Sequence, residues 1–189
     1  MMIVGICGGI ESGKTTVAEH LVIEHGFQAM AFADPLWAML EVIGVDPEQI
    51  ADRRYKDHHP LPHIGKTPRE LIQTLGTEWG RQMVHPDLWV IIAQREIEKH
   101  KRLHGPIDRL VITDVRFDNE AEWIRSMGGK LWHIARPIVD RPRGHSSERG
   151  IDPRYIHRGI VNDGTLDELH ASVDKRVAEL VEELAEVAE

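Results

Sequence analysis

The sequence has a single cysteine, no long apolar run and no excess of positive charge. Among 189 residues only Cys7 carries a thiol, which excludes an internal disulfide and any zinc site built on several thiolates. Cys7 closes an apolar run, so we expect a small buried side chain. No stretch approaches the ~20 apolar residues of a membrane span, and no basic region precedes the short N-terminal apolar run. We therefore expect no membrane segment, no secretory signal and a cytoplasmic protein.

The charge is acidic overall but unevenly distributed. A formal net charge of −8 argues against a general binder of nucleic-acid polymers, which needs a dominant basic surface. Residues 136–158 differ from the rest, because they hold six arginines, no lysine and three acids, a net charge of +3. This distribution points to a small anionic partner.

Apolar runs alternate with helical patterns, which predicts an α/β protein with a parallel sheet flanked by helices. The length suits one domain, 1–189, with an insert at about 35–105 and a lid at about 136–157. The expected strands are 3–7, 27–32, 110–114, 130–135 and 159–161. The expected helices are 14–25, 35–43, one from Pro68 to about 83, 86–103, 118–127 and one from 165 to the end. The last helix has an apolar stripe that favours packing on the sheet over a coiled coil.

Residues 44–65 have no periodicity and are expected to form a loop, with at most one turn at 47–51. The following "TPRE" predicts a helix start with a capping box. An apolar stripe of Leu71, Ile72, Leu75, Trp79 and Met83 then leaves a polar face of Arg69, Gln73, Thr77 and Gly80. On that face Arg69 suits a phosphate and Gln73 a base edge. A solvated helix face is the alternative.

The stretch "GGIESGKT", from Gly8 to Thr15, fits the spacing G-x-x-x-x-G-K-[ST] between a predicted strand and a predicted helix. In such a loop the backbone N–H groups of residues 9–16 surround phosphate oxygens, and the helix N-terminus adds positive potential. Lys14 would reach the β- and γ-phosphates, and the Thr15 hydroxyl would bind Mg²⁺. The candidate phosphate-binding residues are Gly8, Gly9, Ile10, Glu11, Ser12, Gly13, Lys14, Thr15 and Thr16.

Charged residues follow two of the predicted strands. Asp114 ends a buried strand, where it can complete a Mg²⁺ shell with Thr15; alternatively it caps the next turn. Arg116 lies two residues further on and is expected to contact a phosphate. Asp34 follows the second strand and is expected at the same edge of the sheet.

The segment "RPIVDRPRGHSSERG" is charged, interrupted by prolines and aperiodic, as expected of a lid that closes over a transferring phosphoryl group. Arg136, Arg141 and Arg143 are the candidates for stabilising the developing charge, and Glu148 is the candidate for organising them. A surface loop without a role in the reaction is the alternative.

Histidines and tryptophans give weaker signals. The chain has 12 histidines, but none shows a metal-ligand spacing such as HExxH, so we expect no metal cluster. Trp37 and Trp89 lie near segments expected to face a cleft and could stack on a base; core packing is the alternative.

Several of these stretches resemble the deoxynucleoside monophosphate kinases encoded by tailed bacteriophages. The matching stretches are "GGIESGKTTVAEHL", "FADPL", "TPRELIQTLGTEWGRQMVHPDLWV", "VITDVRFDNEAEWIRSMGGKLWHIARP", "HSSE" and "VNDGTLDEL". The resemblance implies a three-layer P-loop kinase fold with a five-stranded parallel sheet in the order 2-3-1-4-5. It also implies transfer of the γ-phosphoryl group of ATP, with Mg²⁺, to a deoxynucleoside 5′-monophosphate in the host cytoplasm, and a homodimer. Asn162 and Gly164 would lie near the adenine.

Two alternatives remain open. Dephospho-CoA kinases share the loop, the "FADPL"-like stretch and the Asn-Gly turn. Their acceptor is a ribose hydroxyl, which needs a general base such as Asp34, whereas a monophosphate attacks through an oxygen that is already anionic and leaves Asp34 to orient the acceptor. A nucleotide-gated ATPase switch would use the same loop without a second anion-binding face.

Overall fold

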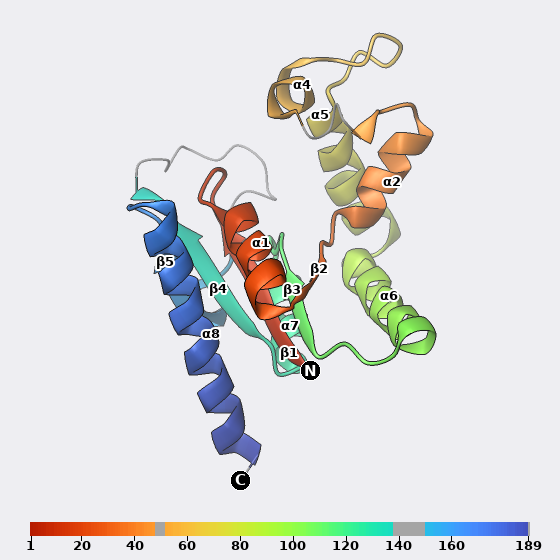
Figure 1. Cartoon of the computed structure of the whole chain (residues 1–189). Helices are drawn as coiled ribbons and strands as arrows, with labels where there is room; N and C mark the ends of the chain where they lie inside the picture. Colours follow the sequence, from red (N-terminus) through yellow and green to blue (C-terminus); the bar gives the residue numbers. More distant parts are fainter. Residues whose placement is uncertain (48–51, 138–149, 189) are drawn as a thin grey trace. The chain divides into compact units, whose positions relative to one another are not determined.

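A five-stranded sheet forms the centre of the first of two structural units. The computed structural model describes residues 1–47, 52–137 and 150–188, and the chain divides into Met1–Met30 with His104–Glu189, and Ala31–Leu103 (Figure 1). All strand pairs are parallel and the order is β2-β3-β1-β4-β5, which confirms the predicted fold class and order. The strands are β1 (Met2–Gly8), β2 (Gln28–Met30), β3 (Arg109–Ile112), β4 (Lys130–Ala135) and β5 (Ile156–Val161).

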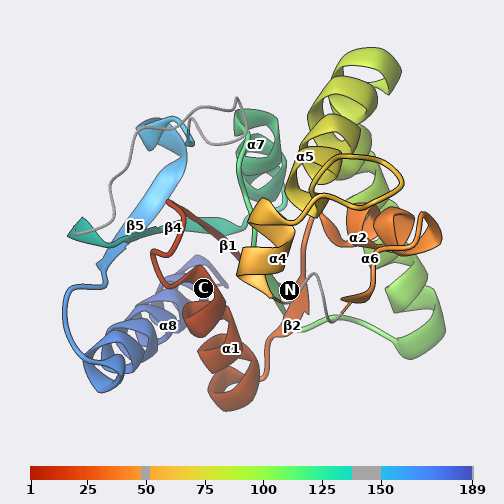
Figure 2. The same cartoon turned by 90° about the horizontal axis from the view of Figure 1, so that it is seen from above.

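Helices cover both faces of this sheet, which gives the unit three layers. In Figure 2, α1 and α8 lie on one side of the sheet and α7 lies on the other. The helical elements of the unit are α1 (Lys14–His25), α7 (Asp118–Ser126), η4 (Pro153–Tyr155, a 3₁₀ turn) and α8 (Leu166–Ala188). The inner strands β1 and β3 have buried apolar runs rather than alternation, because helices bury both faces of a parallel sheet.

The core on the α1–α8 side explains why these helices form. Val17 and Leu21 of α1 and Val173, Val177 and Leu180 of α8 are buried in one apolar cluster with strand residues. The predicted packing of the last helix on the sheet is therefore confirmed. In the part of the chain that the structure describes, no helix is both long enough and apolar enough to cross a membrane.

Cys7 is a buried packing residue, as predicted. It is 2% exposed, and its Sγ donates a weak hydrogen bond to the Trp132 carbonyl at 3.6 Å. Burial raises the pKa of the Cys7 thiol to about 11. At neutral pH the group stays protonated and is a poor nucleophile.

The second unit, 31–103, is helical. Leu40, Val45 and Leu61 form its small core, against which Trp37 packs. The prediction that 44–65 is a loop is wrong in part, because residues after Asp52 form a short helix; the Asp52 carboxylate accepts the Arg54 N–H at 2.8 Å. The elements are α2 (Asp34–Val42), α4 (Arg53–His58), α5 (Pro68–Gln73), η1 (Thr74–Val84) and α6 (Leu88–His104).

The predicted capping box at the start of α5 is confirmed. The Thr67 hydroxyl accepts the Glu70 N–H at 3.2 Å, and the Glu70 carboxylate accepts the Thr67 N–H at 2.8 Å. These bonds lower the pKa of the Glu70 carboxyl. Thr165 and Glu168 repeat the arrangement before α8, with the Glu168 carboxylate accepting the Thr165 N–H at 2.7 Å.

Beyond α5 the predicted helical faces are wrong in part: Leu75 packs against the core as predicted, but residues further along do not follow the prediction. The chain continues as η1, an 11-residue π-helix. A π-helix has a wider turn than an α-helix, so residues that would share an α-helical face drift apart along it. Thr77 and Gly80, expected on an open polar face, are buried, whereas Trp79 and Met83, expected in the apolar stripe, are 38% and 78% exposed.

A substitution at Gly80 tests the packing of η1 against Trp89. A Cβ built at Gly80 would collide with the Trp89 ring, whereas one built at Gly159 in β5 meets no atom within 4 Å. We expect Gly80→Ala to lower the free energy of unfolding by about 1–3 kcal/mol through overpacking, partly offset by better helix propensity. Gly159→Ala, the control, should stay within about 0.5 kcal/mol. Urea unfolding measures both, and equal stabilities would contradict the described contact.

Candidate active site

The loop between β1 and α1 has an unusual backbone. Gly8 and Gly13 have φ values of 143° and 103°, in the region open mainly to glycine. Glu11 is the non-glycine residue with positive φ, at 62°, in the described part of the chain. Such a conformation costs about 1–3 kcal/mol and is typical of ligand-binding loops. Loops of this backbone type can form an anion-binding concavity when successive N–H groups face the same side.

Close contacts with residues of β4 and after β5 leave no space for a side chain at Gly8 or Gly13. A Cβ at Gly8 would collide with the Ile134 carbonyl of β4, and one at Gly13 would collide with the Asn162 side chain. Asn162 follows β5, is 8% exposed, and donates from Nδ2 to the Ser12 carbonyl at 2.9 Å. Its own N–H donates to the Ala135 carbonyl at 2.7 Å. The end of the sheet thus holds the loop in place.

Lys14 lies across this loop. Its Nζ donates to the carbonyls of Gly8 at 3.1 Å and Gly9 at 2.6 Å. Ser12 is 3% exposed, and its buried Oγ has no hydrogen-bond partner among the described residues. A buried polar atom without a partner is uncommon and fits a site that receives a further ligand. Ile10, Glu11 and Thr15 are exposed, and Thr16 is half-buried.

Thr15 and Asp114 follow two neighbouring strands, β1 and β3, in the chain. Thr15 is the second residue of α1, and half-buried Asp114 follows β3, the strand that pairs with β1. Both groups offer oxygen ligands, the type that Mg²⁺ prefers. The two side chains therefore have the right chemistry for the cation predicted from the sequence.

A buried carboxylate shapes the segment that carries Arg116. Glu120 is 2% exposed, and its Oε2 accepts the N–H groups of Arg116 at 2.7 Å and Phe117 at 3.0 Å. The Arg116 residue itself is exposed. Sequence reasoning missed Glu120; the available signal was its position beside Ala121 and four residues before Ile124, on the buried face of α7.

The candidate acceptor residues belong to the second unit. Asp34 is exposed at the start of α2 and accepts the Ala31 N–H at 2.8 Å. Arg69 is paired: its Nε donates to Asp57 Oδ1 at 2.5 Å, with 26% of its side chain exposed. Gln73 is half-buried at the end of α5. A phosphate that bound Arg69 would compete with the Asp57 carboxylate. The sequence alone did not indicate the ion pair between Arg69 and Asp57.

Trp89 is a packing residue, which corrects its assignment as a substrate contact. The side chain is 2% exposed, and its Nε1 donates to the Gly76 carbonyl at 2.7 Å. A ring buried against Gly80 cannot stack on a base without opening the unit. Core packing, the alternative weighed for Trp89, is what the structure supports.

Two further candidate residues are exposed. Arg136 is exposed directly after β4, and Gly164 is exposed in the turn before α8. Arg141, Arg143 and Glu148 lie outside the described residues, so their roles stay predictions.

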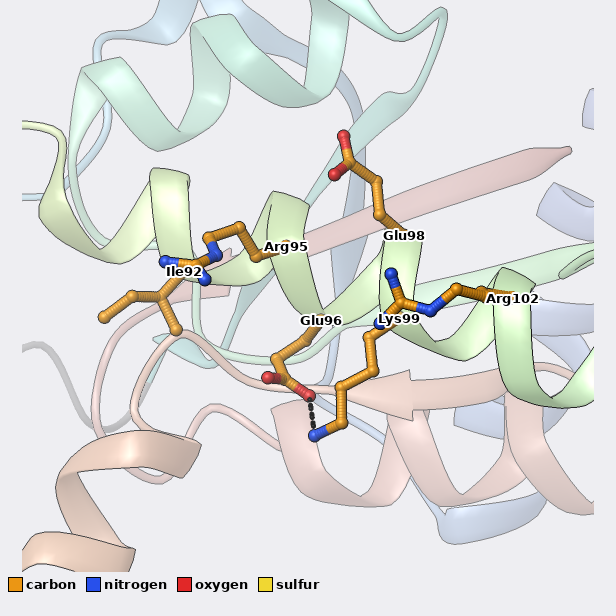
Figure 3. A pocket seen from close by; sticks show the side chains of 6 residues that line it. All are labelled: Ile92, Arg95, Glu96, Glu98, Lys99 and Arg102. Carbon is orange, nitrogen blue, oxygen red and sulfur yellow. Dashed lines mark hydrogen bonds and ion pairs between the residues drawn. The ribbon is translucent and has the colours of Figure 1, made fainter.

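A hollow of about 300 Å³ lies along an exposed face of α6 (Figure 3). Five of its six lining side chains are charged, and the ion pair from Lys99 Nζ to Glu96 Oε2, 3.1 Å long, stands at its edge. None of its lining residues is a predicted site residue, and surface ion pairs of this kind contribute little energy. We assign it no part in the reaction.

A glycine-rich loop with the spacing G-x-x-x-x-G-K-[ST] joins β1 to α1 beside a parallel sheet ordered 2-3-1-4-5, and this combination is typical of the class of P-loop kinases. A solved structure, TT1252 from Thermus thermophilus, shares this fold, with a TM-score of 0.52 and 21% identity over 95% of this chain and 97% of that one. At this identity the likeness describes the fold alone.

The sequence model of the deoxynucleotide monophosphate kinase family matches residues 66–173. A protein of Acanthamoeba polyphaga mimivirus, provisionally named a deoxynucleotide monophosphate kinase, is 34% identical over 184 residues, 92% of this chain and 94% of the relative. The deoxynucleoside-5′-monophosphate kinase of Escherichia phage T5 is 34% identical over 134 residues, 67% of this chain and 51% of that enzyme. The chain belongs to the deoxynucleotide monophosphate kinase family and is a kinase. It spans about half the length of the phage T5 enzyme.

Asn162 offers a test of how the loop is held. Its amide bonds to the loop backbone, so Asn162→Ala should weaken binding of any nucleoside triphosphate, whatever its base. Losing one hydrogen bond predicts a roughly three- to tenfold weaker affinity, equal for ATP and GTP. Asp163→Ala, which changes the exposed neighbour, is the control. Titration calorimetry measures both nucleotides; a loss confined to ATP would instead mean that Asn162 reads the adenine.

Proposed function

We propose that the protein transfers the γ-phosphoryl group of ATP to the phosphate of a deoxynucleoside 5′-monophosphate, yielding ADP and a deoxynucleoside diphosphate. The proposal rests mainly on Lys14, whose Nζ donates hydrogen bonds to the Gly8 and Gly9 carbonyls of the glycine-rich loop. The family to which the chain belongs supports it further. The reaction suits free nucleotides, since the net charge of −8 disfavours a nucleic-acid polymer.

On the donor side, Lys14 exchanges the carbonyls of Gly8 and Gly9 for the β- and γ-phosphate oxygens. The N–H groups of residues 9–16 surround the remaining phosphate oxygens. Thr15 and Asp114 hold Mg²⁺, which when bound neutralises charge on the phosphates. Asn162 and Gly164 border the adenine, with Asn162 also fixing the Ser12 carbonyl.

On the acceptor side, no general base is required, because the attacking phosphate oxygen is already anionic. Asp34 orients the acceptor rather than deprotonating it. Arg69 binds the acceptor phosphate in place of Asp57, and Gln73 contacts the base edge. Arg116 provides a further phosphate contact.

The charge that develops on the transferred group needs compensation. In the proposal Arg136, Arg141 and Arg143 supply it from the segment after β4, and Glu148 organises them. Arginines suit this task because the guanidinium binds phosphate oxygens through two parallel N–H donors.

A panel of acceptors tests the proposal. The four deoxynucleoside monophosphates, their ribose counterparts and dephospho-CoA are each incubated with ATP and Mg²⁺, and products are separated by anion exchange. We expect a deoxynucleoside diphosphate as the main product. Lys14→Ala should lower turnover at least about a hundredfold. Lys66→Ala, which removes an exposed lysine of the second unit, should leave turnover unchanged.

Three outcomes would contradict the proposal. Preferred phosphorylation of dephospho-CoA, abolished by Asp34→Asn, would indicate a hydroxyl acceptor. Phosphate release that is independent of every added acceptor would indicate a nucleotide-gated ATPase. Full activity of Lys14→Ala would remove the loop from the reaction.

A further inference from the structure

Two histidines and an aspartate meet where α1 packs against α8. His20 Nε2 lies 2.6 Å from Asp174 Oδ1, and His25 Nε2 lies 2.7 Å from the same oxygen. One ligand atom from each of the three residues lies within 4.8 Å of the others. Both helices belong to the first unit and run side by side (Figure 2). The group lies at the opposite end of α1 from Lys14, so it is separate from the nucleotide loop.

The packing of the two helices produces this arrangement. His25 is the last residue of α1, which ends at Gly26 in a left-handed conformation with φ 67°. Asp174 follows Val173, which is fully buried in the same apolar cluster as Leu21. The three side chains therefore converge because the core fixes the helices beneath them. The convergence is a property of the fold rather than of one flexible side chain.

The histidine rings are held in fixed orientations. The His20 and His25 rings are edge to face, with centroids 5.6 Å apart and planes at 73°. His170, one turn before Asp174 on α8, stacks on His20 with centroids 4.0 Å apart. The His20 side chain is 9% exposed and that of His25 is 19% exposed. Rings restrained in this way are suited to bind a cation without a large loss of conformational entropy.

The chemistry of the group matches zinc. Two imidazole nitrogens and one carboxylate oxygen, with a fourth position for water, form a common zinc ligand set, with bonds of about 2.0–2.2 Å. Tetrahedral bonds of this length separate the ligand atoms by about 3.3–3.6 Å. The two Nε2–Oδ1 distances are 2.6 and 2.7 Å, so each must lengthen by about 0.6–1.0 Å. The Asp174 side chain is 52% exposed and can rotate to allow this.

Solvent reaches the group at Asp174. The Asp174 side chain is 52% exposed, so a cation can enter from solvent at this carboxylate.

We propose that His20, His25 and Asp174 form a zinc-binding site that links α1 to α8. Zinc replaces the two hydrogen bonds to Asp174 with three coordinate bonds across the helix pair, and each neutral ring then carries its proton on Nδ1 instead of Nε2, by exchange with solvent. Binding to the folded state alone raises the stability of the unit by mass action. Since α1 begins at the phosphate loop, the site supports the element that positions Lys14 without taking part in phosphoryl transfer.

Zinc binding to the full-length chain tests this directly. The protein is stripped with a chelator and titrated with Zn²⁺ in competition with a chromophoric chelator. The test variants are His20→Gln with His25→Gln, which place amide donors where the imidazole nitrogens stood, and Asp174→Asn. His63→Ala removes an exposed histidine of the second unit and is the control for the other histidines.

We expect one zinc per chain in the wild type and in His63→Ala, with affinity at least about tenfold weaker in both test variants. Zinc should raise the melting temperature of the wild type but not of the test variants. Co²⁺ should give the intense visible bands of a four-coordinate site in the wild type alone. Circular dichroism checks that each variant folds. If the double glutamine variant does not fold, the zinc affinity of Asp174→Asn alone tests the site.

Equal zinc affinity in the wild type and the folded test variants would overturn the proposal, because the metal would then bind other histidines. Absence of zinc binding to the wild type at micromolar metal would overturn it as well. Neither result depends on nucleotide turnover, so failure here is distinct from failure of the proposed phosphoryl transfer.

Discussion

The structure of the candidate active site depends on the close approach of the β1–α1 loop to the ends of β4 and β5. Gly8 passes the Ile134 carbonyl, and Gly13 lies beneath the Asn162 amide, at distances that leave no space for a Cβ. Any larger residue at either position must move the loop or the sheet. The adjacent strands therefore fix the path of the loop backbone, and an anion-binding arrangement of its N–H groups depends on that path.

The strands and most helices could be predicted because their signals are local. Short apolar runs marked the strands, and the Thr67–Glu70 pair marked the start of α5. The strand order followed from resemblance rather than from periodicity. The errors arose where packing overrides local pattern. In the π-helix η1, Thr77 and Gly80 are buried, whereas an α-helical pattern placed them on an open face. Asp52 is the N-cap of a short helix in a stretch without periodicity.

The candidate site was predictable in its motif but not in its supporting contacts. The loop spacing revealed Lys14 and Thr15, whereas Glu120 and Asn162 act through backbone groups that no motif records. The pairing of Arg69 with Asp57 spans 12 positions, and that of His20 with Asp174 spans 154. Contacts at such separations depend on tertiary packing, so residue spacing along the chain carries no signal for them.

The central claim is that the main-chain amides of this loop bind a triphosphate. The most direct measurement is the change in backbone amide resonances, by nuclear magnetic resonance, when a nonhydrolysable ATP analogue and Mg²⁺ are added. The account predicts that the amides of residues 9–16 change most, while that of Gly159 in β5 changes little. Unchanged loop amides in a protein that nonetheless binds the analogue would contradict it.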